Sequence, residues 1–364
     1  EIFGLALCEN YHYQLPNSLT SAYVFAVTAT KVTLLVPKNI ELEFYVIPDE
    51  DRFFERMLSI NLVLDKFRKF ARERIAAGPL TLIIGGSETG KFSLARILAN
   101  YALRTEFSPV FVDLDPRSAR LAPKGTIALA PLKNEVPFSF VEAEKVCYFF
   151  GHSSLKDNFE LYLRAVKSLF RALRARETAS SAEFRSRLRS GAALSTPHSV
   201  GEAGRGALAV LPAEISVFSS SQIAKLVEEI APDFIVSLRA DSICAALPHK
   251  RIVRLLANSG VFQTPPEHKN YLSSLRASGY FSSESVNCVL EPVTSGSLTI
   301  VQIDSTNSLP LNYLSQAEEA LRVVRVDPQV TSLKGRTLVL LNLKTTESVT
   351  VDRVLEAEVL FLFQ

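Results

Sequence analysis

The chain has 364 residues, with 40 Lys and Arg against 38 Asp and Glu and a net charge of +2. This near balance excludes a uniformly basic protein that coats nucleic acid without specificity, so any contact with nucleic acid must be local. Hydrophobic residues at 47% and charged residues at 21% exclude a disordered chain and indicate a globular protein. At roughly 100–200 residues per domain, the length allows about two or three domains.

Neither a membrane segment nor an export signal stands out in the sequence. No apolar run approaches the ~18 residues of a membrane helix, and the N-terminal residues lack the basic-then-apolar layout of a secretion signal. The cysteines have no zinc-site or CxxC spacing; they are Cys8, Cys147, Cys244 and Cys288. We expect a soluble, intracellular protein in a reducing compartment, with ordinary buried cysteines. Because the chain begins at Glu1 inside a strand-like run, we also expect its start to be incomplete.

Residues 1–50 have the pattern of a small antiparallel β domain. Short β-branched or aromatic runs alternate with turn residues, and the predicted strands are Ile2–Leu7, Tyr23–Thr28, Lys31–Val36 and Glu41–Ile47. Over residues 51–78 the apolar side chains recur instead at helical spacing, with acids near the start and Lys or Arg near the end. We expect a connecting helix there, leading out of the β domain.

Residues 79–282 alternate strand and helix patterns. Leu80–Ile84 and Val110–Leu114 are mostly apolar, as strands of a buried parallel sheet are, and the pattern of Lys91–Leu103 between them is helical. The further predicted strands are Val146–Phe150, Ala192–Leu194, Phe234–Leu238 and Ile252–Leu256, and the further predicted helices are Asp157–Arg176 and Ser220–Ile230. This order predicts an α/β fold, a doubly wound domain with a mostly parallel sheet.

Residues 283–364 predict a small C-terminal β domain. Short apolar runs separated by turn residues follow one another there, with almost no helical pattern. The predicted strands are Val289–Val293, Leu298–Ile303, Leu321–Val326, Arg336–Leu341, Ser348–Val354 and Ala357–Phe363.

A phosphate-binding pattern, G-x-x-x-x-G-K, occurs at Gly85-Gly86-Ser87-Glu88-Thr89-Gly90-Lys91. It follows a predicted strand and precedes a predicted helix, as the motif requires. Glycines permit the tight turn, backbone N–H groups at the helix N-terminus attract phosphate, and Lys91 supplies a positive charge for the β and γ phosphates. The alternative is a chance glycine-rich turn. We predict a central P-loop NTPase domain that binds nucleotide phosphates through these residues, with Phe92 and Ser93 adjoining them.

The position after Lys91 argues against a bound metal. In P-loop proteins a Ser or Thr hydroxyl there ligates Mg²⁺, but this chain has Phe92, which offers no oxygen. Ser93 lies about 100° further round the helix and is therefore a poor replacement. We predict no metal-ligating residue, expect Phe92 to belong to the core, and expect Mg²⁺ to bind only weakly.

Two aspartates close the second strand of this domain. Strand alternation puts Asp113 and Asp115 on one face, where one of them could take the proton of an attacking hydroxyl if the protein were a kinase. The alternative is that one or both cap the following loop at Pro116.

Seven arginines and Lys167 occur between Arg164 and Arg189. They could form a patch that faces RNA. We favour the alternative of a solvated helix face followed by a mobile loop over Glu177–Glu183.

Three stretches of the central domain strongly resemble the polyribonucleotide 5′-hydroxyl-kinase family. They are GGSETGKFSLARILANYALR at 85–104, VFVDLDP at 110–116 and KGTIALAP at 124–131, with weaker matches in EIFG at 1–4, RSGAALSTP at 189–197 and SLPL at 308–311. The family includes the ATP-binding subunit of the mRNA cleavage and polyadenylation factor, and its fungal branch, in cleavage factor IA, is the most similar.

The resemblance implies a domain order and a function. The family has an N-terminal β domain that helps to hold the adenine, a central P-loop domain and a C-terminal β domain. The resemblance implies a nuclear protein of mRNA 3′-end formation that binds ATP and bridges other subunits of the factor, notably the large scaffold subunit. Animal-type members phosphorylate RNA 5′-hydroxyls, whereas fungal members generally hold ATP without turning it over. The catalytic-type aspartate of the family carries over to Asp115.

Several departures from the family pattern weigh against catalysis. Phe92 stands at the family's Ser or Thr, and Ser195 stands where the fungal pattern has an Asp. His198 occupies the region of the family's aromatic clasp, and Arg276 is the only arginine in the lid stretch at 271–281. We therefore predict a non-catalytic ATP-binding scaffold. The alternatives are an active RNA 5′-hydroxyl kinase, which would use Asp115 or Asp113, and an interaction module that no longer binds nucleotide.

Overall fold

The computed structural model describes most of the middle of the chain and short segments after it. The described residues are 52–74, 76–118, 120–134, 136, 145–189, 206–245, 247, 251–256, 261, 274, 300–305, 321–326, 337–340 and 359–362. The predicted β domain over 1–50 lies outside them, as do the predicted strands Ala192–Leu194, Val289–Val293 and Ser348–Val354.

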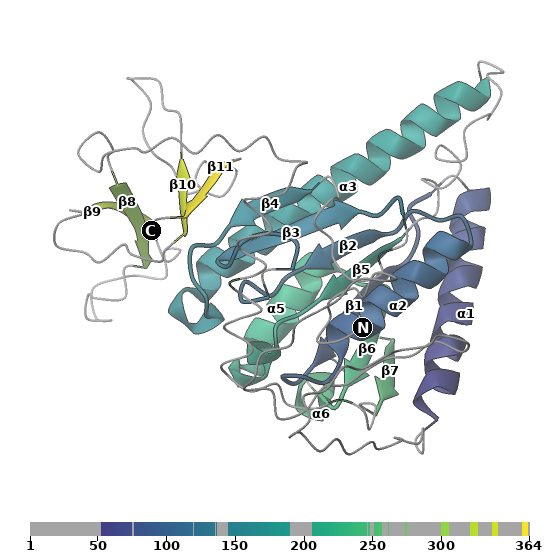
Figure 1. Ribbon diagram of the computed structural model, residues 1–364, viewed down its shortest axis with the longest axis horizontal. Coiled ribbons are helices and arrows are strands. Elements are labelled where there is room, and N and C mark those ends of the chain that lie inside the picture. Colours follow the sequence, from purple (N-terminus) through teal and green to yellow (C-terminus); the bar gives the residue numbers. More distant parts are fainter. Residues whose placement is uncertain are drawn as a thin grey trace, which may run out of the picture.

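A seven-stranded sheet forms the centre of the described structure (Figure 1). Its strands are β1 (Leu80–Gly85), β2 (Val110–Asp113), β3 (Thr126–Pro131), β4 (Val146–Phe149), β5 (Ala207–Val210), β6 (Phe234–Leu238) and β7 (Ile252–Leu255). They lie in the order β4-β3-β2-β5-β1-β6-β7. The neighbouring strands β2-β5-β1-β6-β7 all pair in parallel. β3 pairs antiparallel with both β2 and β4. The sheet is therefore mostly parallel, as the sequence predicts.

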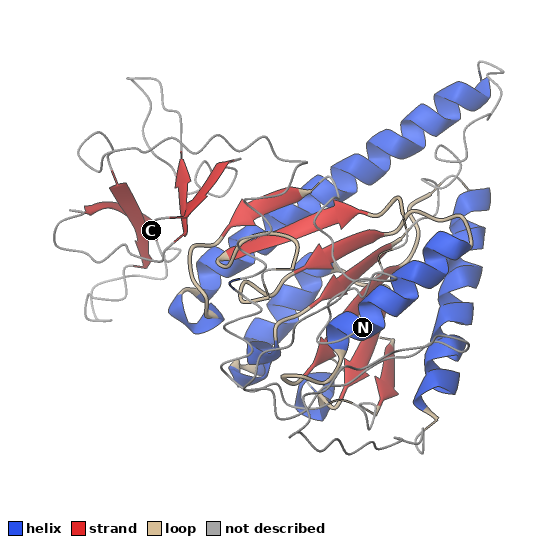
Figure 2. Cartoon of the chain, viewed as in Figure 1, coloured by secondary structure: helices blue, strands red, loops and turns tan. Residues whose placement is uncertain are grey.

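Helices cover both faces of this sheet (Figure 2). Strand alternation divides the core into two clusters: Leu82 and Ile84 of β1 belong to the cluster with α3 and α5, and Ile83 belongs to the cluster with α1 and α2. The helices are α1 (Phe53–Glu73), α2 (Lys91–Arg104), α3 (Phe159–Arg189), α5 (Ser220–Ile230) and the short α6 (Asp241–Ala245). The predicted α/β class with a doubly wound sheet is confirmed.

The sequence analysis does not predict two strands of the sheet, β3 and β5. β5 has the sequence ALAV, and β3 has TIALAP, so alanines alternate with the apolar residues in both. Alanine has a weak preference for strands, and such short runs carry little signal of their own. Both strands are completely buried in the sheet, and this tertiary burial decides their conformation.

The end of α3 corrects a prediction. The sequence analysis ends this helix at Arg176 and places a mobile loop at Glu177–Glu183, but the helix continues without a break to Arg189. Its Ser and Thr residues resemble a loop signal, while the Ala, Glu and Arg residues among them favour helix and prevail. The last turns of α3 extend beyond the sheet (Figure 1).

The segments flanking the sheet bear on the other predicted elements. α1 falls within the range 51–78 expected for the connecting helix. In the C-terminal part, β8 (Ile300–Ser305) pairs antiparallel with β9 (Leu321–Val326), and β10 (Thr337–Leu340) with β11 (Val359–Leu362). The strands predicted at these four places are confirmed, whereas the division into domains at 50, 78 and 282 stays a prediction. Among the described residues, no helix is both long and apolar enough to cross a bilayer.

Candidate phosphate-binding site

The loop between β1 and α2 has the tight geometry that its glycines allow. A Cβ atom at Gly85 would lie 2.6 Å from the Thr89 hydroxyl oxygen and 2.8 Å from the Leu238 carbonyl oxygen, so only glycine fits there. Gly90 has a φ of +86°, in the left-handed region that favours glycine. The Thr89 hydroxyl donates to the Gly86 carbonyl over 3.1 Å and closes the turn. α2 begins directly afterwards, at Lys91, so the positive end of its dipole faces the loop.

Lys91 folds over this loop and is buried, with 6% of its surface exposed. Its ammonium donates to the carbonyls of Gly85 and Gly86 over 2.9 and 2.5 Å. Burial lowers the pKa of Lys91 to about 8; the Asp115 carboxylate opposes this shift, and the positive charges of Arg117 and Arg120 add to it. The lysine is therefore still mostly cationic at neutral pH and lies within electrostatic reach of both arginines.

Phe92 is half-buried and packs against the core. Its ring lies 6.3 Å from that of Phe111, centroid to centroid, and it contacts the apolar cluster between the sheet and α1–α2. The Arg120 guanidinium carbon lies 4.3 Å from the centroid of the Phe92 ring. Ser93, the adjoining hydroxyl, is exposed on α2.

The residues at the loop do not fit a bound Mg²⁺. Phe92 offers no ligand, the exposed Ser93 is turned from the core, and both carboxylate oxygens of Asp113 accept internal hydrogen bonds. Within the described part of the chain, no cluster of three or more His, Cys, Asp and Glu residues could hold a metal ion.

Asp113 caps the turn that follows β2. It is 4% exposed; one carboxylate oxygen accepts the Asp115 N–H over 3.1 Å, and the other accepts the Ser118 hydroxyl. Burial and the Asp115 carboxylate raise the pKa of Asp113 to about 7, against the opposing effects of these hydrogen bonds and of Arg120. This geometry is that of the capping alternative.

Asp115 interacts electrostatically with the loop lysine. Its carboxylate accepts the Arg117 N–H over 3.0 Å, and its charge stabilises the ammonium of Lys91. Burial raises the pKa of Asp115, while the Arg117 N–H, the Arg117 charge and Lys91 oppose the shift. Of the two predicted catalytic candidates, Asp115 is the one that the structure couples to Lys91 most strongly.

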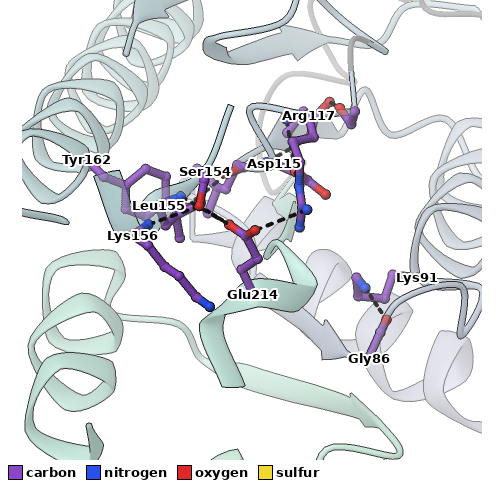
Figure 3. A network of polar contacts seen from close by, with 12 residues as sticks. Gly86, Lys91, Asp115, Arg117, Ser154, Leu155, Lys156, Tyr162 and Glu214 are labelled. Carbon is purple, nitrogen blue, oxygen red and sulfur yellow. Dashed lines mark hydrogen bonds and ion pairs between the residues drawn. The ribbon is translucent and has the colours of Figure 1, made fainter. Parts of the chain in front are cut away.

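Sequence reasoning missed Glu214, which ties three segments together beside the loop (Figure 3). Glu214 belongs to a short helix, η2 (Ala213–Val217), directly after β5. Its carboxylate binds the Arg117 guanidinium over 3.0 Å and accepts the Ser154 hydroxyl over 3.2 Å and the Leu155 N–H over 3.1 Å. A carboxylate just after a central strand would have marked Glu214 as a candidate site residue. The sequence of β5, however, does not identify it as a strand.

The basic run on α3 is used partly within the protein. Lys167 forms an ion pair with Glu229 over 3.1 Å, and Arg174 donates to the carbonyls of Glu229 and Ile230 at the C-terminal end of α5. Cations at this end of a helix stabilise its dipole. RNA contact stays a prediction for the 164–189 region.

Three other predicted positions, Ser195, His198 and Arg276, lie outside the described residues. The cysteine prediction is tested at two positions. Cys244 is buried and Cys147 is half-buried, both as free thiols, and burial raises the pKa of Cys147 to about 11.

Comparison with known proteins identifies relatives of the P-loop domain. Residues 85–188 match the family model described as the P-loop of the mRNA cleavage and polyadenylation factor CLP1. A CLP1 homolog from Dictyostelium discoideum is 31% identical over 172 residues, which is 46% of this chain and 36% of that protein. The mRNA cleavage and polyadenylation factor CLP1 of Vanderwaltozyma polyspora is 24% identical over 354 residues, which is 93% of this chain and 74% of that protein.

The similarity is uneven along the relatives. The matched region spans little more than a third of the Dictyostelium protein and 28% of the CLP1 homolog from Arabidopsis thaliana, which is 32% identical over 126 residues. Among solved structures, the wild-type Clp1p–Pcf11p (454–563) complex has a TM-score of 0.57 and 19% identity, and the superposition covers 79% of this chain and 66% of that one. At this identity the structural likeness establishes the fold.

Proposed function

We propose that this chain belongs to the CLP1 family, whose P-loop model its residues 85–188 match, and that it is a non-catalytic ATP-binding subunit of an mRNA cleavage and polyadenylation factor. The observation that carries the proposal is a complete phosphate loop without a metal ligand. Gly85, Gly90 and Lys91 have the geometry of a phosphate cradle, and Phe92 replaces the hydroxyl that would hold Mg²⁺.

The chemistry of phosphoryl transfer supports the non-catalytic half of the proposal. Transfer needs charge stabilisation on the moving phosphoryl group, mainly from metal ions and arginines, and a single arginine finger contributes about 10³–10⁵ in rate. Ground-state binding needs less, because backbone N–H groups and one lysine hold the phosphates. Losing the metal ligand therefore reduces the rate far more than the affinity.

The partner part of the proposal draws on the relatives. One solved structural neighbour is a complex of Clp1p with a segment of Pcf11p, and the Vanderwaltozyma protein is named as a cleavage and polyadenylation factor. We propose that this chain likewise bridges subunits of such a factor, among them its large scaffold subunit, in the nucleus.

Calorimetry and a kinase assay on the full chain together test the function. We expect ATP to bind, Lys91→Ala to weaken binding at least about tenfold through the loss of a charged phosphate contact, and Lys66→Ala on the exposed side of α1 to leave it unchanged. A 5′-hydroxyl RNA oligonucleotide should receive no γ-phosphate. Transfer that Lys91→Ala abolishes would overturn the non-catalytic assignment.

The rival function is an RNA 5′-hydroxyl kinase, which the electrostatic coupling of Asp115 to Lys91 favours. If metal coordination limits such a site, Phe92→Ser should increase transfer, and Asp115→Asn in that background should abolish it. Absence of ATP binding by the unmodified chain would instead favour an interaction module.

A further inference from the structure

Two arginines follow β2 and lie beside the phosphate loop. Arg117 binds the Glu214 carboxylate over 3.0 Å and is part of the structural network around Asp115. Arg120 has a different placement, because its guanidinium carbon lies 4.3 Å from the centroid of the Phe92 ring. Phe92 is the residue directly after the loop lysine, so Arg120 contacts the side chain that stands in place of the metal-ligating hydroxyl of P-loop proteins.

The electrostatics agree with this position. The positive charge of Arg120 contributes to the lowered pKa of Lys91 and also favours the charged form of Asp113 at the end of β2. One guanidinium thus acts on both the loop lysine and the strand-end carboxylate. In metal-dependent P-loop sites the cation acts on the same two elements, the residue after the lysine and an acid on a neighbouring strand.

We propose that Arg120, held over the Phe92 ring, replaces the divalent cation at the P-loop, so that a nucleoside triphosphate binds here without metal. The inference rests on the proposed ATP-binding function and extends it to the way in which the phosphate charge is neutralised. Phe92 then has two effects. It stands in place of the metal-ligating hydroxyl, and its ring provides the aromatic face that holds the arginine.

The chemistry of the guanidinium suits this role. It stays protonated throughout the physiological pH range and presents five N–H donors in one plane, which match phosphate oxygens in bidentate fashion. Arginine side chains and divalent cations both serve as positively charged clamps on phosphoryl oxygens. A cation over a phenyl ring is attracted by the negative face of the ring, and this attraction positions Arg120 before the ligand arrives.

The test compares ATP binding by the full chain in EDTA and in excess Mg²⁺, by calorimetry. We expect the Kd of the unmodified chain to change less than about threefold between the two conditions. Arg120→Gln should weaken binding in EDTA about tenfold or more, as the loss of a charged hydrogen bond to phosphate does, and Arg120→Lys should restore part of it. Arg171→Gln, at an exposed position on α3, is the matched control and should bind as the unmodified chain does.

Phe92→Ser provides the reverse test. It removes the ring beneath Arg120 and supplies a hydroxyl for a metal, so binding should become tighter in Mg²⁺ than in EDTA. Thermal melts of each variant establish that it is folded.

The outcomes separate the two proposals. If the unmodified chain binds ATP only with Mg²⁺, or if folded Arg120→Gln binds as tightly as the unmodified chain in EDTA, the role of Arg120 is overturned and the ATP-binding function stands. If the unmodified chain binds ATP in neither condition, the function itself is overturned, and the role of Arg120 with it.

Discussion

Lys91 combines burial with a task that needs its charge. Burial lowers its pKa to about 8, so the ammonium that would bind phosphate is lost as the pH rises through that value. We expect the Kd for ATP to increase several-fold between about pH 7 and pH 9. In Lys91→Met the affinity should be low and should lack this pH dependence. A flat profile in the unmodified chain, measured by calorimetry in buffers of equal ionic strength, would contradict the assignment of the phosphate contact to Lys91.

Asp113 should make the protein less stable as the pH rises. Its folded-state pKa of about 7 lies above the ordinary value of 3.8, so the unfolded chain releases this proton at lower pH than the folded one. The stabilisation is complete below about pH 4 and is lost by about pH 7. Asp113→Asn can still accept the Asp115 N–H and can donate to the Ser118 oxygen, so it should remove this pH dependence and be at least as stable at pH 8. Urea unfolding of both proteins at several pH values would check this expectation. An unchanged pH dependence of the free energy of unfolding in Asp113→Asn would contradict it.

At the residue scale, the sequence predicts the loop from Gly85 to Lys91 because the motif is contiguous and each position has a local reason. The contacts of Phe92 with Arg120 and of Arg117 with Glu214 could not be predicted in this way. They join residues from separate loops, and they depend on the position of β5, whose sequence alone does not identify it as a strand.

Among the elements, α1 shows two different faces. Leu64 is 1% exposed and packs against the sheet, whereas Leu62, two residues earlier, is 55% exposed. Leu64→Ala should cost roughly 2–5 kcal/mol in the free energy of unfolding, because it removes buried methyl groups and leaves a cavity. Leu62→Ala should change the stability by no more than about 0.5 kcal/mol. Chemical denaturation of the two variants is a matched comparison, and equal effects would contradict the expectation that burial decides the cost.

The elements that the sequence predicts well are those with strong period or length. β6 and α5 begin and end at the predicted residues, and the end of β1 differs by one residue. Such segments carry their own signal in apolar runs or in caps, as the Ser219 capping box of α5 does. The extension of α3 to Arg189 was missed because its polar residues have the composition of a loop but the propensity of a helix.

On the scale of the whole molecule, ATP should stabilise the fold by mass action. At about a hundred times the Kd, a ligand adds about 2.7 kcal/mol of stability, which corresponds to a rise of roughly 5–10 °C in Tm for a domain of this size. We expect this rise in EDTA as well as in Mg²⁺, and we expect it to be absent in Lys91→Ala. A scan of Tm against ATP concentration measures it, with ADP and inorganic phosphate as comparisons. A rise seen only with Mg²⁺ would contradict this expectation.

The strand order has a consequence for folding during synthesis on the ribosome. β5 lies between β1 and β2, although β2 ends at Asp113 and β5 begins only at Ala207. A ribosome that adds about 5–20 residues per second needs roughly 5–20 s to cover this interval. During that time the two apolar strands have emerged, but their common neighbour has not yet been made. Until translation reaches β5, the facing edges of β1 and β2 lack their native partner, and unpaired strand edges of this kind are prone to aggregation.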